Sequence, residues 1–466
     1  MKTSVALAVA IWLATAAHAD AAAADPGRAA LRAIFEEMIE TDTSPAGSCT
    51  KLVRTTEQRL KAAGFSGDDV QLVIPDGRPE EGNIVARIRS ANATQKGVLL
   101  LAHIDVVTAR REDWERDPFT LIEENGYFYG RGTSDDKSMA AVFLDLMIRL
   151  KQERSFRPRR DLIMALTCGE ETSSRVNGVE YLLQNRRELI DAAFAINEGA
   201  GGLLSEDGKP LAVQVQAGEK VHQVYALEVT NPGGHSSRPV PDNAIYRLAL
   251  ATQKVAALSF PIEVNPVVRE YFRVTGPIVG GDTGAAMSAV ATNPADPAAL
   301  ATLMRDPTYN ALVHTTCVST QIEGGHAPNA LPQRATMTVS CRVMQGTTPE
   351  QVKEIIERAV GDSQVKVSIV HRRAGAPAPE LTPEIMGPVK AQAARLWPGV
   401  PVAPIMIAPA TDGRFLMNAG IPTYGMSGMF ARSGETNQHG LNEKLRVQSL
   451  YEGREFLEGV VRAYVK

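Results

Sequence analysis

The feature that most constrains the fold is an alternation of short apolar runs with stretches of helical spacing along the N-terminal half of the chain. Helical patterns begin near Gly27, at Cys49 and near Ser138. The apolar runs read "VQLVI", "NIVARI", "GVLLLAHIDVV" and "DLIMALT". Apolar runs of this length are typical of strands that are buried on both faces. The alternation therefore predicts an α/β domain, with a mostly parallel sheet flanked by helices.

The pattern changes near Ala217. Segments such as "VHQVYALEVT" and "ATMTVSCRV" alternate polar and apolar residues, and two helical stretches accompany them. Two helices packed on a small antiparallel sheet, a ferredoxin-like α+β arrangement, fit this pattern. We expect one domain to comprise residues 25–216 and 374–466, with residues 217–373 inserted into it as a second domain. Residues 263–316 look like a further insertion within that second domain, and the sequence assigns them no role.

The first 19 residues have the layout of a secretory signal peptide. Lys2 gives a positive start, an apolar stretch runs from Val5 to Ala17, and "AHA" supplies small residues before Asp20. The apolar stretch is shorter than the about 20 residues that a membrane-spanning helix needs. We expect an exported protein, periplasmic or secreted, with no membrane attachment after cleavage. An uncleaved anchor is the alternative.

The composition argues against two classes of protein. The net charge of −4 leaves no basic excess for binding a nucleic acid. Four cysteines in 466 residues do not make a disulfide scaffold, although an exported chain can form disulfides. Cys317 and Cys341 both lie in strand-like segments and can pair, but spacing leaves the pairing of Cys49, Cys168, Cys317 and Cys341 open. Cys168 is expected to be a buried thiol rather than a nucleophile, since no histidine-partnered arrangement is evident.

The stretch "ALTCGEETSS" places two adjacent carboxylates, Glu170 and Glu171, directly after a buried strand. Other polar residues also follow the apolar runs or lie near the C-terminus: His103, Asp105, Asp135, Asp136, Lys137, Glu198 and His439. Each pattern alone has a structural reading, such as a hydrogen-bonded pair, a glycine-rich turn or a solvated face. Strand ends of an open parallel sheet converge at one edge. Carboxylates and imidazoles from several strand ends therefore predict a metal site there.

Seven motifs occur in the order found in one enzyme family. They are "LLLAHIDVV", "WERDPF…YFYGRGTSDDK", "TCGEE", "INEGA", "NPGGHSSRP", "IEGG…NALP" and "NQHGLNE", and they span residues 97 to 443. In these motifs the chain resembles the co-catalytic di-zinc metallopeptidase family, which includes aminoacylase, carboxypeptidase G, carboxypeptidase S and acetylornithine deacetylase. The resemblance implies a zinc-peptidase-like catalytic domain at residues 25–216 and 374–466. It also implies that residues 217–373 form a lid and dimerisation domain.

The resemblance implies two Zn²⁺ ions per chain that share Asp136 as a bridging ligand, in a site that also accepts Co²⁺ or Mn²⁺. His103 and Glu198 would complete one zinc site, and Glu171 and His439 the other. Two zinc ions about 3.5–4 Å apart hold one water molecule and one carbonyl oxygen between them.

Two further acids gain roles from the same resemblance. Asp105 would accept the second ring N–H of His103 and so fix its tautomer. Glu170 would be the general base that takes a proton from the metal-bound water and passes it to the leaving amine. The paired charges of Glu170 and Glu171 are then offset by the cations.

The inserted domain would supply residues that contact the substrate. His235 matches a lid histidine that stabilises the oxyanion, often from the partner subunit of a homodimer. Asn329 and Arg342 match substrate-binding positions, and a guanidinium can pair bidentately with a carboxylate. Arg414, in "TDGR", is expected at the border of the substrate site. The alternative roles are a structural turn for His235 and an ordinary ion pair for Arg342.

These roles imply an exported zinc-dependent hydrolase of an amide bond adjacent to a free carboxylate. The substrate would be a short peptide, cut by a carboxypeptidase, or an N-acyl amino acid, cut by an amidohydrolase. Glu198, rather than aspartate, favours the aminoacylase side of the family. A carnosinase-type dipeptidase is the alternative enzyme. A non-catalytic metal-binding or dimerisation protein is disfavoured, because it would not need Glu170 and His235. The substrate side chain and the native metal stay open.

Overall fold

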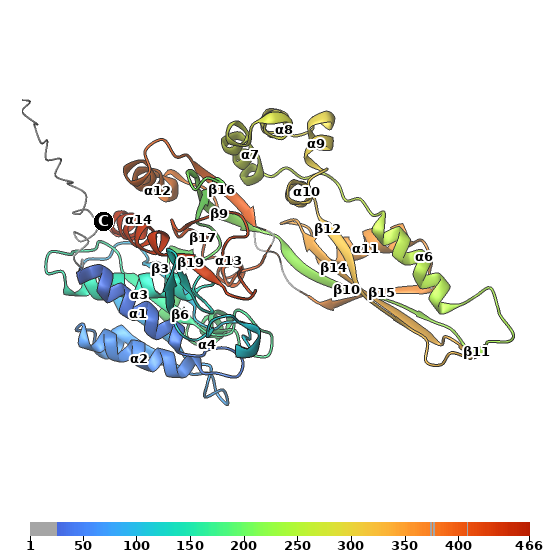
Figure 1. Ribbon diagram of the computed structural model, residues 1–466, viewed down its shortest axis with the longest axis horizontal. Helices are drawn as coiled ribbons and strands as arrows, with labels where there is room; N and C mark the ends of the chain where they lie inside the picture. Colours follow the sequence, from blue (N-terminus) through green and yellow to red (C-terminus); the bar gives the residue numbers. More distant parts are fainter. Residues whose placement is uncertain (1–25, 373–374, 376–377, 408) are drawn as a thin grey trace, which may run out of the picture.

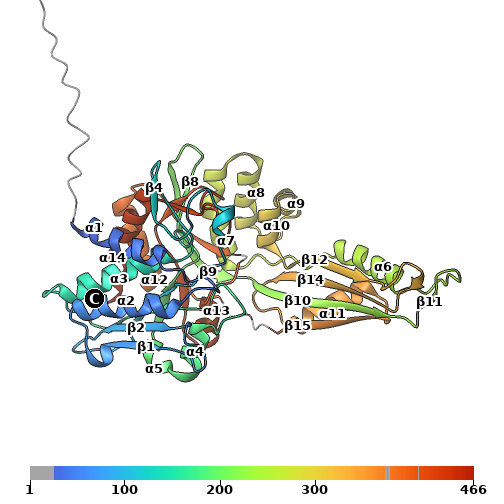
Figure 2. The same ribbon diagram turned by 60° about the horizontal axis from the view of Figure 1, so that its bottom comes forward.

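The computed structural model describes residues 26–372, 375, 378–407 and 409–466, so the predicted signal peptide at residues 1–19 lies outside the described residues. The chain forms a larger α/β domain and an elongated inserted domain that extends away from it (Figure 1 and Figure 2). In the part of the chain that the structure describes, no helix combines the length and the apolar character needed to cross a membrane.

A ten-stranded mixed sheet forms the centre of the larger domain, in the order β1-β2-β6-β3-β7-β17-β9-β8-β18, with β16 also paired to β9. Strands β6, β3, β7 and β17 run parallel to one another, in agreement with the prediction of a mostly parallel sheet. The ten strands are β1 (Val70–Val73), β2 (Asn83–Ile88), β3 (Val98–His103), β6 (Leu162–Thr167), β7 (Phe194–Asn197), β8 (Gly202–Leu204), β9 (Pro210–Glu219), β16 (Val402–Ile407), β17 (Thr423–Gly425) and β18 (Phe430–Ala431).

Helices cover both faces of this sheet, as predicted. Alternate residues of one strand enter different cores, because successive side chains point to opposite faces: Leu100 joins one cluster, and Leu99 and Leu101 the other. The first face carries α1 (Pro26–Glu40), α2 (Cys49–Ala62), α3 (Lys137–Gln152), α12 (Pro383–Leu396) and α14 (Val447–Tyr464). The second carries α4 (Gly178–Asn185), α5 (Arg187–Ile190) and α13 (Gly413–Asn418). A small sheet of β4 (Ile122–Glu124), β5 (Tyr127–Tyr129) and β19 (Lys444–Arg446) completes this domain.

The inserted domain is an antiparallel sheet in the order β12-β14-β10-β15 with two helices packed on it. Burial alternates along β10, which matches the period-two pattern of its sequence. A two-stranded ribbon of β11 and β13 forms the far tip of the domain (Figure 1 and Figure 2). The elements are β10 (Val221–Thr230), β11 (Gly234–His235), α6 (Ala244–Ala256), β12 (Thr316–Gly324), β13 (Ala330–Leu331), β14 (Arg334–Val343), α11 (Pro349–Val360) and β15 (Val365–His371).

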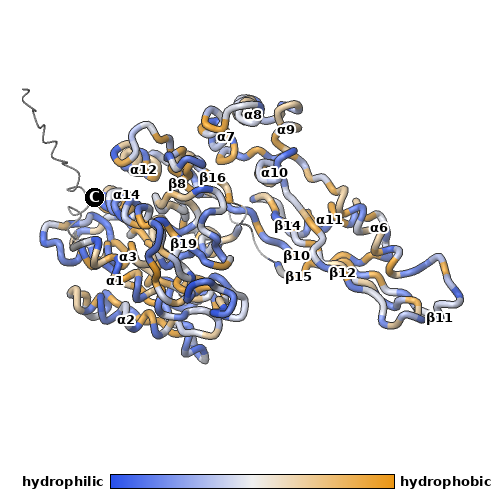
Figure 3. Tube along the Cα trace, viewed as in Figure 1, coloured by the Kyte–Doolittle hydropathy of each residue, from blue (hydrophilic) through white to orange (hydrophobic). Residues whose placement is uncertain are grey.

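Four helices occupy most of residues 263–316, and they correct the expected domain boundary. They are α7 (Pro266–Val279), α8 (Gly281–Thr292), α9 (Pro297–Leu303) and α10 (Pro307–Val313). Their buried side chains, including Val268, Phe272 and Met287, belong to the core cluster of the larger domain. Figure 3 shows hydrophobic residues along α7, which packs against β16. This segment therefore interrupts the inserted domain in sequence but packs with the larger domain.

Two disulfides account for all four cysteines. Cys317 pairs with Cys341 across β12 and β14, where the two residues are direct neighbours in the ladder. Cys49, at the start of α2, pairs with Cys168, which corrects the expectation that Cys168 is a thiol. The guanidinium of Arg175 contacts both sulfurs of the second disulfide, at 3.0 and 3.1 Å. This disulfide thus ties the segment after β6, which carries Glu170 and Glu171, to α2.

Candidate metal centre

Three neighbouring strands deliver five of the predicted site residues to one edge of the sheet: His103, Asp105, Glu170, Glu171 and Glu198. Strand β3 ends at His103, whose register partner on β6 is Thr167. Glu170 follows β6 by three residues, and Glu198 directly follows β7. Because β6, β3 and β7 are parallel neighbours, their carboxyl ends open into the same crevice. The structure thus brings these residues together at the edge where the strand ends were expected to converge.

A single carboxylate lies between the two histidines. The Nε2 atom of His103 is 3.0 Å from Oδ1 of Asp135, and the Nε2 atom of His439 is 3.2 Å from Oδ2 of the same residue. Each histidine also approaches a second acid, Glu198 at 3.7 Å from His103 and Glu171 at 2.9 Å from His439. The five side chains therefore form two groups that share Asp135.

The structure gives this shared position to Asp135 and not to Asp136, the predicted bridging residue. The Oδ2 atom of Asp136 is buried and has no hydrogen-bond partner among the described residues. Burial raises the pKa of Asp136 well above its ordinary value, which favours the neutral acid. Its main-chain carbonyl accepts the N–H groups of Met139 and Ala140 at the start of α3. Asp136 thus begins a helix, while the residue before it faces the histidines.

Asp105 also has a different contact from the predicted one. Its main-chain oxygen, 3.0 Å from Nδ1 of His103, accepts the ring N–H, whereas its carboxylate lies 3.8 Å from that nitrogen. The carboxylate instead accepts the main-chain N–H groups of Glu170 at 3.2 Å and Glu171 at 3.1 Å. Asp105 therefore holds the acidic pair in place with its side chain and leaves Nε2 of His103 facing the cluster.

The electrostatics of the cluster reflect many acids in a small buried volume. Burial raises the pKa of Glu170 to about 8 and that of Glu198 well above its ordinary value. Burial alone would also raise the pKa of Asp135, but hydrogen bonds from His103 and His439 outweigh it and lower that pKa. The pKa of His439 rises to about 10, mainly because of its hydrogen bonds to Asp135 and Glu171.

The donor set fits divalent cations. Ligand atoms of His103, Asp135 and Glu171 lie within 4.8 Å of one another, as do those of His103, Glu170 and Glu198. Imidazole nitrogens and carboxylate oxygens are the ligands that Zn²⁺ binds in catalytic sites. The orientation of His103, set by the carbonyl of Asp105, is also the outer-shell arrangement typical of metal-binding histidines.

In protein from which a chelator has removed divalent cations, we expect the free energy of unfolding to decrease as the pH rises from about 5 to about 8. Folded Glu170 keeps its proton up to a pH of about 8, whereas the unfolded chain loses it near 4.5. His439 likewise binds its proton more tightly when folded. The folded state therefore holds extra protons in this window, and raising the pH favours unfolding.

Thermal unfolding of the chelated protein at about pH 5.5 and about pH 8 measures this dependence. Added Zn²⁺ should oppose it, because the metal would displace the proton from His439 and its charge would lower the pKa of Glu170. A Tm of the chelated protein that rises between these pH values would contradict the expectation.

Two predicted residues of the inserted domain, His235 and Asn329, lie at its far tip and not at this cluster (Figure 1). His235 and Asn329 lie together at the tip, where the main-chain N–H of Ser236 donates to the carbonyl of Asn329. Both are exposed. Arg342 lies at the opposite end of the inserted sheet, opposite His222 at the start of β10. A ten-residue strand such as β10 spans about 33 Å, so the two ends are far apart.

Arg414 lies in the larger domain at the start of α13, beside two buried acids that the sequence reasoning missed. Asp412 accepts a hydrogen bond from Asn177, and its charge adds to the raised pKa of Glu170. Glu219 accepts the N–H and hydroxyl of Thr411, both at 3.0 Å. The "TDGR" motif contains Asp412, but neither residue follows a strand of the parallel pattern that identified the other acids.

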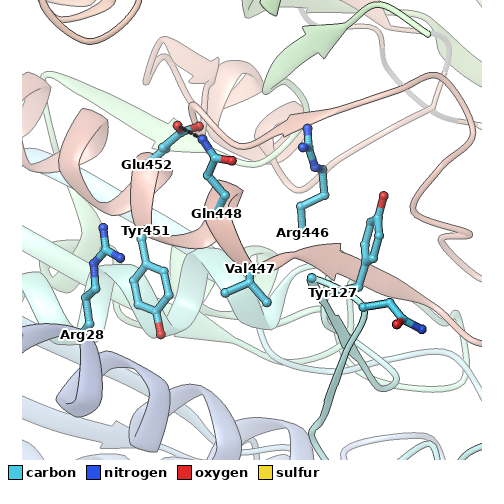
Figure 4. Close-up of a pocket in the computed structure, with 9 residues that line it drawn as sticks. Arg28, Tyr127, Arg446, Val447, Gln448, Tyr451 and Glu452 are labelled. Atoms are coloured by element: carbon cyan, nitrogen blue, oxygen red, sulfur yellow. Dashed lines mark hydrogen bonds between the residues drawn. The ribbon is translucent and has the colours of Figure 1, made fainter. Parts of the chain in front are cut away.

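A surface pocket of about 670 Å³ lies elsewhere in the larger domain and contains none of the predicted site residues. Figure 4 shows Tyr127, Arg446, Val447 and Tyr451 on its wall, with Arg28 beside Tyr451. The candidate centre is therefore defined by the strand ends and not by this pocket.

Comparisons with known proteins agree with the geometry. The human N-fatty-acyl-amino acid synthase/hydrolase PM20D1 is 28% identical over 387 residues, which cover 79% of this chain and 74% of that protein. The probable carboxypeptidase S-like 2 of Dictyostelium discoideum is 28% identical over 381 residues, 79% of this chain and 71% of that protein. The M20 family metallo-carboxypeptidase Sso-CP2 from Sulfolobus solfataricus shares the fold, with a TM-score of 0.66 and 19% identity over 93% of this chain and 98% of that one.

The family model described as Peptidase family M20/M25/M40 matches residues 99–463, a range that contains every predicted metal ligand. The family is metal-dependent, and the donor set at the strand ends fits this property. The chain therefore belongs to peptidase family M20/M25/M40 and is a hydrolytic enzyme of the metallopeptidase and amidohydrolase type.

Proposed function

We propose that this protein is an exported hydrolase of an amide bond adjacent to a free carboxylate, and that it uses two Zn²⁺ ions. The observation that carries the proposal is the carboxylate of Asp135, which contacts both His103 and His439. Each histidine has a second acid beside it, so the chain offers two ligand groups with one shared member. Two cations held by these two ligand groups would lower the pKa of a water molecule and polarise the substrate carbonyl.

Each residue of the cluster has a separate proposed role. His103 and Glu198 would hold one cation, His439 and Glu171 the other, and Asp135 both. Glu170 would act as the general base that takes the proton from water and returns it to the leaving amine. Its place in the cluster beside His103 and Glu198 supports this role.

Arginine side chains support a substrate with a carboxylate. Arg342 and Arg414 are the predicted substrate-binding cations, and a guanidinium binds a carboxylate bidentately. The names of the two relatives point to the same chemistry, since an N-fatty-acyl amino acid and the C-terminal end of a peptide both present an amide next to a carboxylate. We therefore place N-acyl amino acids and C-terminally free peptides in the substrate class, with a carnosinase-type dipeptidase as the second candidate.

A matched substrate panel tests this class. The purified protein should hydrolyse N-acyl amino acids or acylated peptides, and replacing the free carboxylate by a carboxamide should lower kcat/KM by about 100-fold, the loss of one charged hydrogen-bonded pair. Comparing the hydrolysis of dipeptides that have a free amine with that of their N-acetylated forms distinguishes the dipeptidase, the second candidate, from the first. Equal hydrolysis of acids and amides would contradict the proposal. Hydrolysis confined to dipeptides with a free amine would favour the dipeptidase.

Export rests on residues 1–19 and on the two disulfides, which persist in oxidising compartments. N-terminal sequencing of the protein from a cell-envelope or culture fraction should find a mature chain that begins near Asp20. A full-length chain confined to the reducing cytosol would contradict export.

We further propose that the active enzyme is a homodimer in which His235 of the partner subunit reaches the metal centre. The Nδ1 atom of His235 accepts the N–H of Ser237, so the neutral ring carries its proton on Nε2, where it can donate to an oxyanion. Within one chain this histidine lies at the far tip of the inserted domain, where β11 is drawn in Figure 2.

An apolar face on the inserted domain suits a second copy of the chain. It consists of α6 and the edge strand β12, with exposed side chains of Tyr246 (62%), Leu250 (60%) and Ile322 (61%). Edge strands with exposed apolar residues favour pairing with another chain, and a twofold axis would let each copy serve the other.

Subunit mixing tests the shared site. Glu170→Gln and His235→Ala should each be inactive alone, but hybrids of the two contain one intact site. Co-refolded mixtures should therefore recover about a quarter of wild-type activity. Absence of any recovery, with hybrids shown to form, would contradict a contribution from the partner.

A further inference from the structure

Two proposed ligands come from loops rather than from the ends of parallel strands. Asp135 lies in the turn before α3, and His439 lies in the loop before β19. His439 has a left-handed backbone conformation, with φ of 62°, and its side chain is 56% exposed. The packing of the central sheet therefore does not fix the distance between these two residues, although both must reach the same cations.

A buried pair, Arg131 and Glu443, joins the two loops. The carboxylate of Glu443 accepts the N–H groups of Ser134 at 2.8 Å and Asp135 at 3.1 Å through one oxygen. Through its other oxygen it accepts the N–H of Gly132 at 3.0 Å and the guanidinium of Arg131 at 2.8 Å.

Arg131 completes the connection from the other side. Its second terminal nitrogen donates to the main-chain carbonyls of Gly440 at 2.9 Å and His439 at 3.4 Å. Arg131 is 2% exposed and Glu443 is 1% exposed. A buried ion pair adds little net stability unless its hydrogen bonds are satisfied. Here most of these bonds go to the main chain of the two ligand-bearing loops.

We propose that the pair of Arg131 and Glu443, the Arg131–Glu443 clamp, sets the separation of Asp135 and His439 and thereby the affinity of the enzyme for its metal ions. Both residues are positioning residues, because neither touches the ligand atoms. This inference rests on the proposed two-metal function. Glu443 acts on Asp135, which faces both cation positions, whereas Arg131 also acts on His439, which faces only one.

Zn²⁺ titration of the full-length mature protein with a competing chelator tests the clamp. Removing an outer-shell partner weakens metal binding by about 10–100-fold, and we expect Glu443→Gln to weaken both sites in that range. Arg131→Lys keeps the charge opposite Glu443 but cannot reach both carbonyls, so it should weaken one site more than the other. With Zn²⁺ saturating, kcat should fall while KM changes little.

Asp145 provides a matched control. It is 2% exposed and accepts hydrogen bonds from Arg149 at 2.9 Å and Arg454 at 2.8 Å, outside both loops. Asp145→Asn makes the same acid-to-amide change and should lower Tm without changing Zn²⁺ affinity.

Wild-type binding is measured first, so that the two proposals can fail separately. A wild-type chain that binds no Zn²⁺ would contradict the proposed function itself. Wild-type affinity in Glu443→Gln, or a loss no greater than in Asp145→Asn, would overturn the clamp alone. If Glu443→Gln does not fold, Arg131→Lys provides the test. Wild-type Zn²⁺ affinity at both metal sites of this variant would overturn the clamp.

Discussion

Replacing Glu170 with glutamine should lower kcat by about 10²–10⁴-fold, the usual contribution of a general base, while two Zn²⁺ ions stay bound per chain. Glutamine keeps the shape of the side chain but cannot take a proton from water. The carboxylate of Asp105 binds the main-chain N–H of residue 170, so the loop should keep its position in the variant.

Metal content and turnover must be measured on the same preparation. Glu180→Gln is the matched control, since Glu180 is exposed on α4 and the same chemical change there lies outside the cluster. Wild-type turnover in Glu170→Gln would remove this residue from the mechanism. A loss of turnover together with a loss of metal would instead make Glu170 a ligand.

The second prediction distinguishes the roles of two adjacent residues, Asp135 and Asp136. Asp135→Asn should weaken binding of both Zn²⁺ ions, by more than the about 100-fold that an outer-shell change costs, and should abolish turnover. Asp136→Asn should leave both near wild type. The Asp136 carboxyl favours its neutral form in the metal-free chain, and an amide of the same shape can replace it.

Chelator competition and turnover on both variants give the result directly. Because the two changes are chemically identical and adjacent in sequence, each variant controls for the other. Loss of both metals in Asp136→Asn with retention in Asp135→Asn would restore the ligand set inferred from the motif and contradict a bridging role for Asp135.

The sequence predicted the sheet, and it placed three of the proposed ligands at the edge of the sheet for a physical reason. Buried parallel strands are continuous apolar runs, and their ends are visible as the first polar residues, so the pattern alone could place His103, Glu171 and Glu198 at one edge. His439 was found only through its family motif, because the loop that carries it has no periodic pattern.

What could not be predicted depends on contacts between distant segments. In "SDDK" either aspartate can face the metal, and only the backbone path into α3 decides between Asp135 and Asp136. The pairing of Cys49 with Cys168 spans 119 residues, a separation that sequence alone does not resolve. The helices of residues 263–316 contribute apolar side chains to the core of the larger domain. This packing could not be predicted, because in the sequence these helices lie between two segments of the inserted domain.

The central claim is that the carboxylate of Asp135 bridges two metal ions. Anomalous diffraction at the zinc edge, from crystals of the zinc-loaded protein, tests it most directly. We expect two zinc peaks about 3.5–4 Å apart, one on each oxygen of Asp135, with His103 beside one and His439 beside the other. A single peak, or two peaks that Asp135 does not touch, would contradict it.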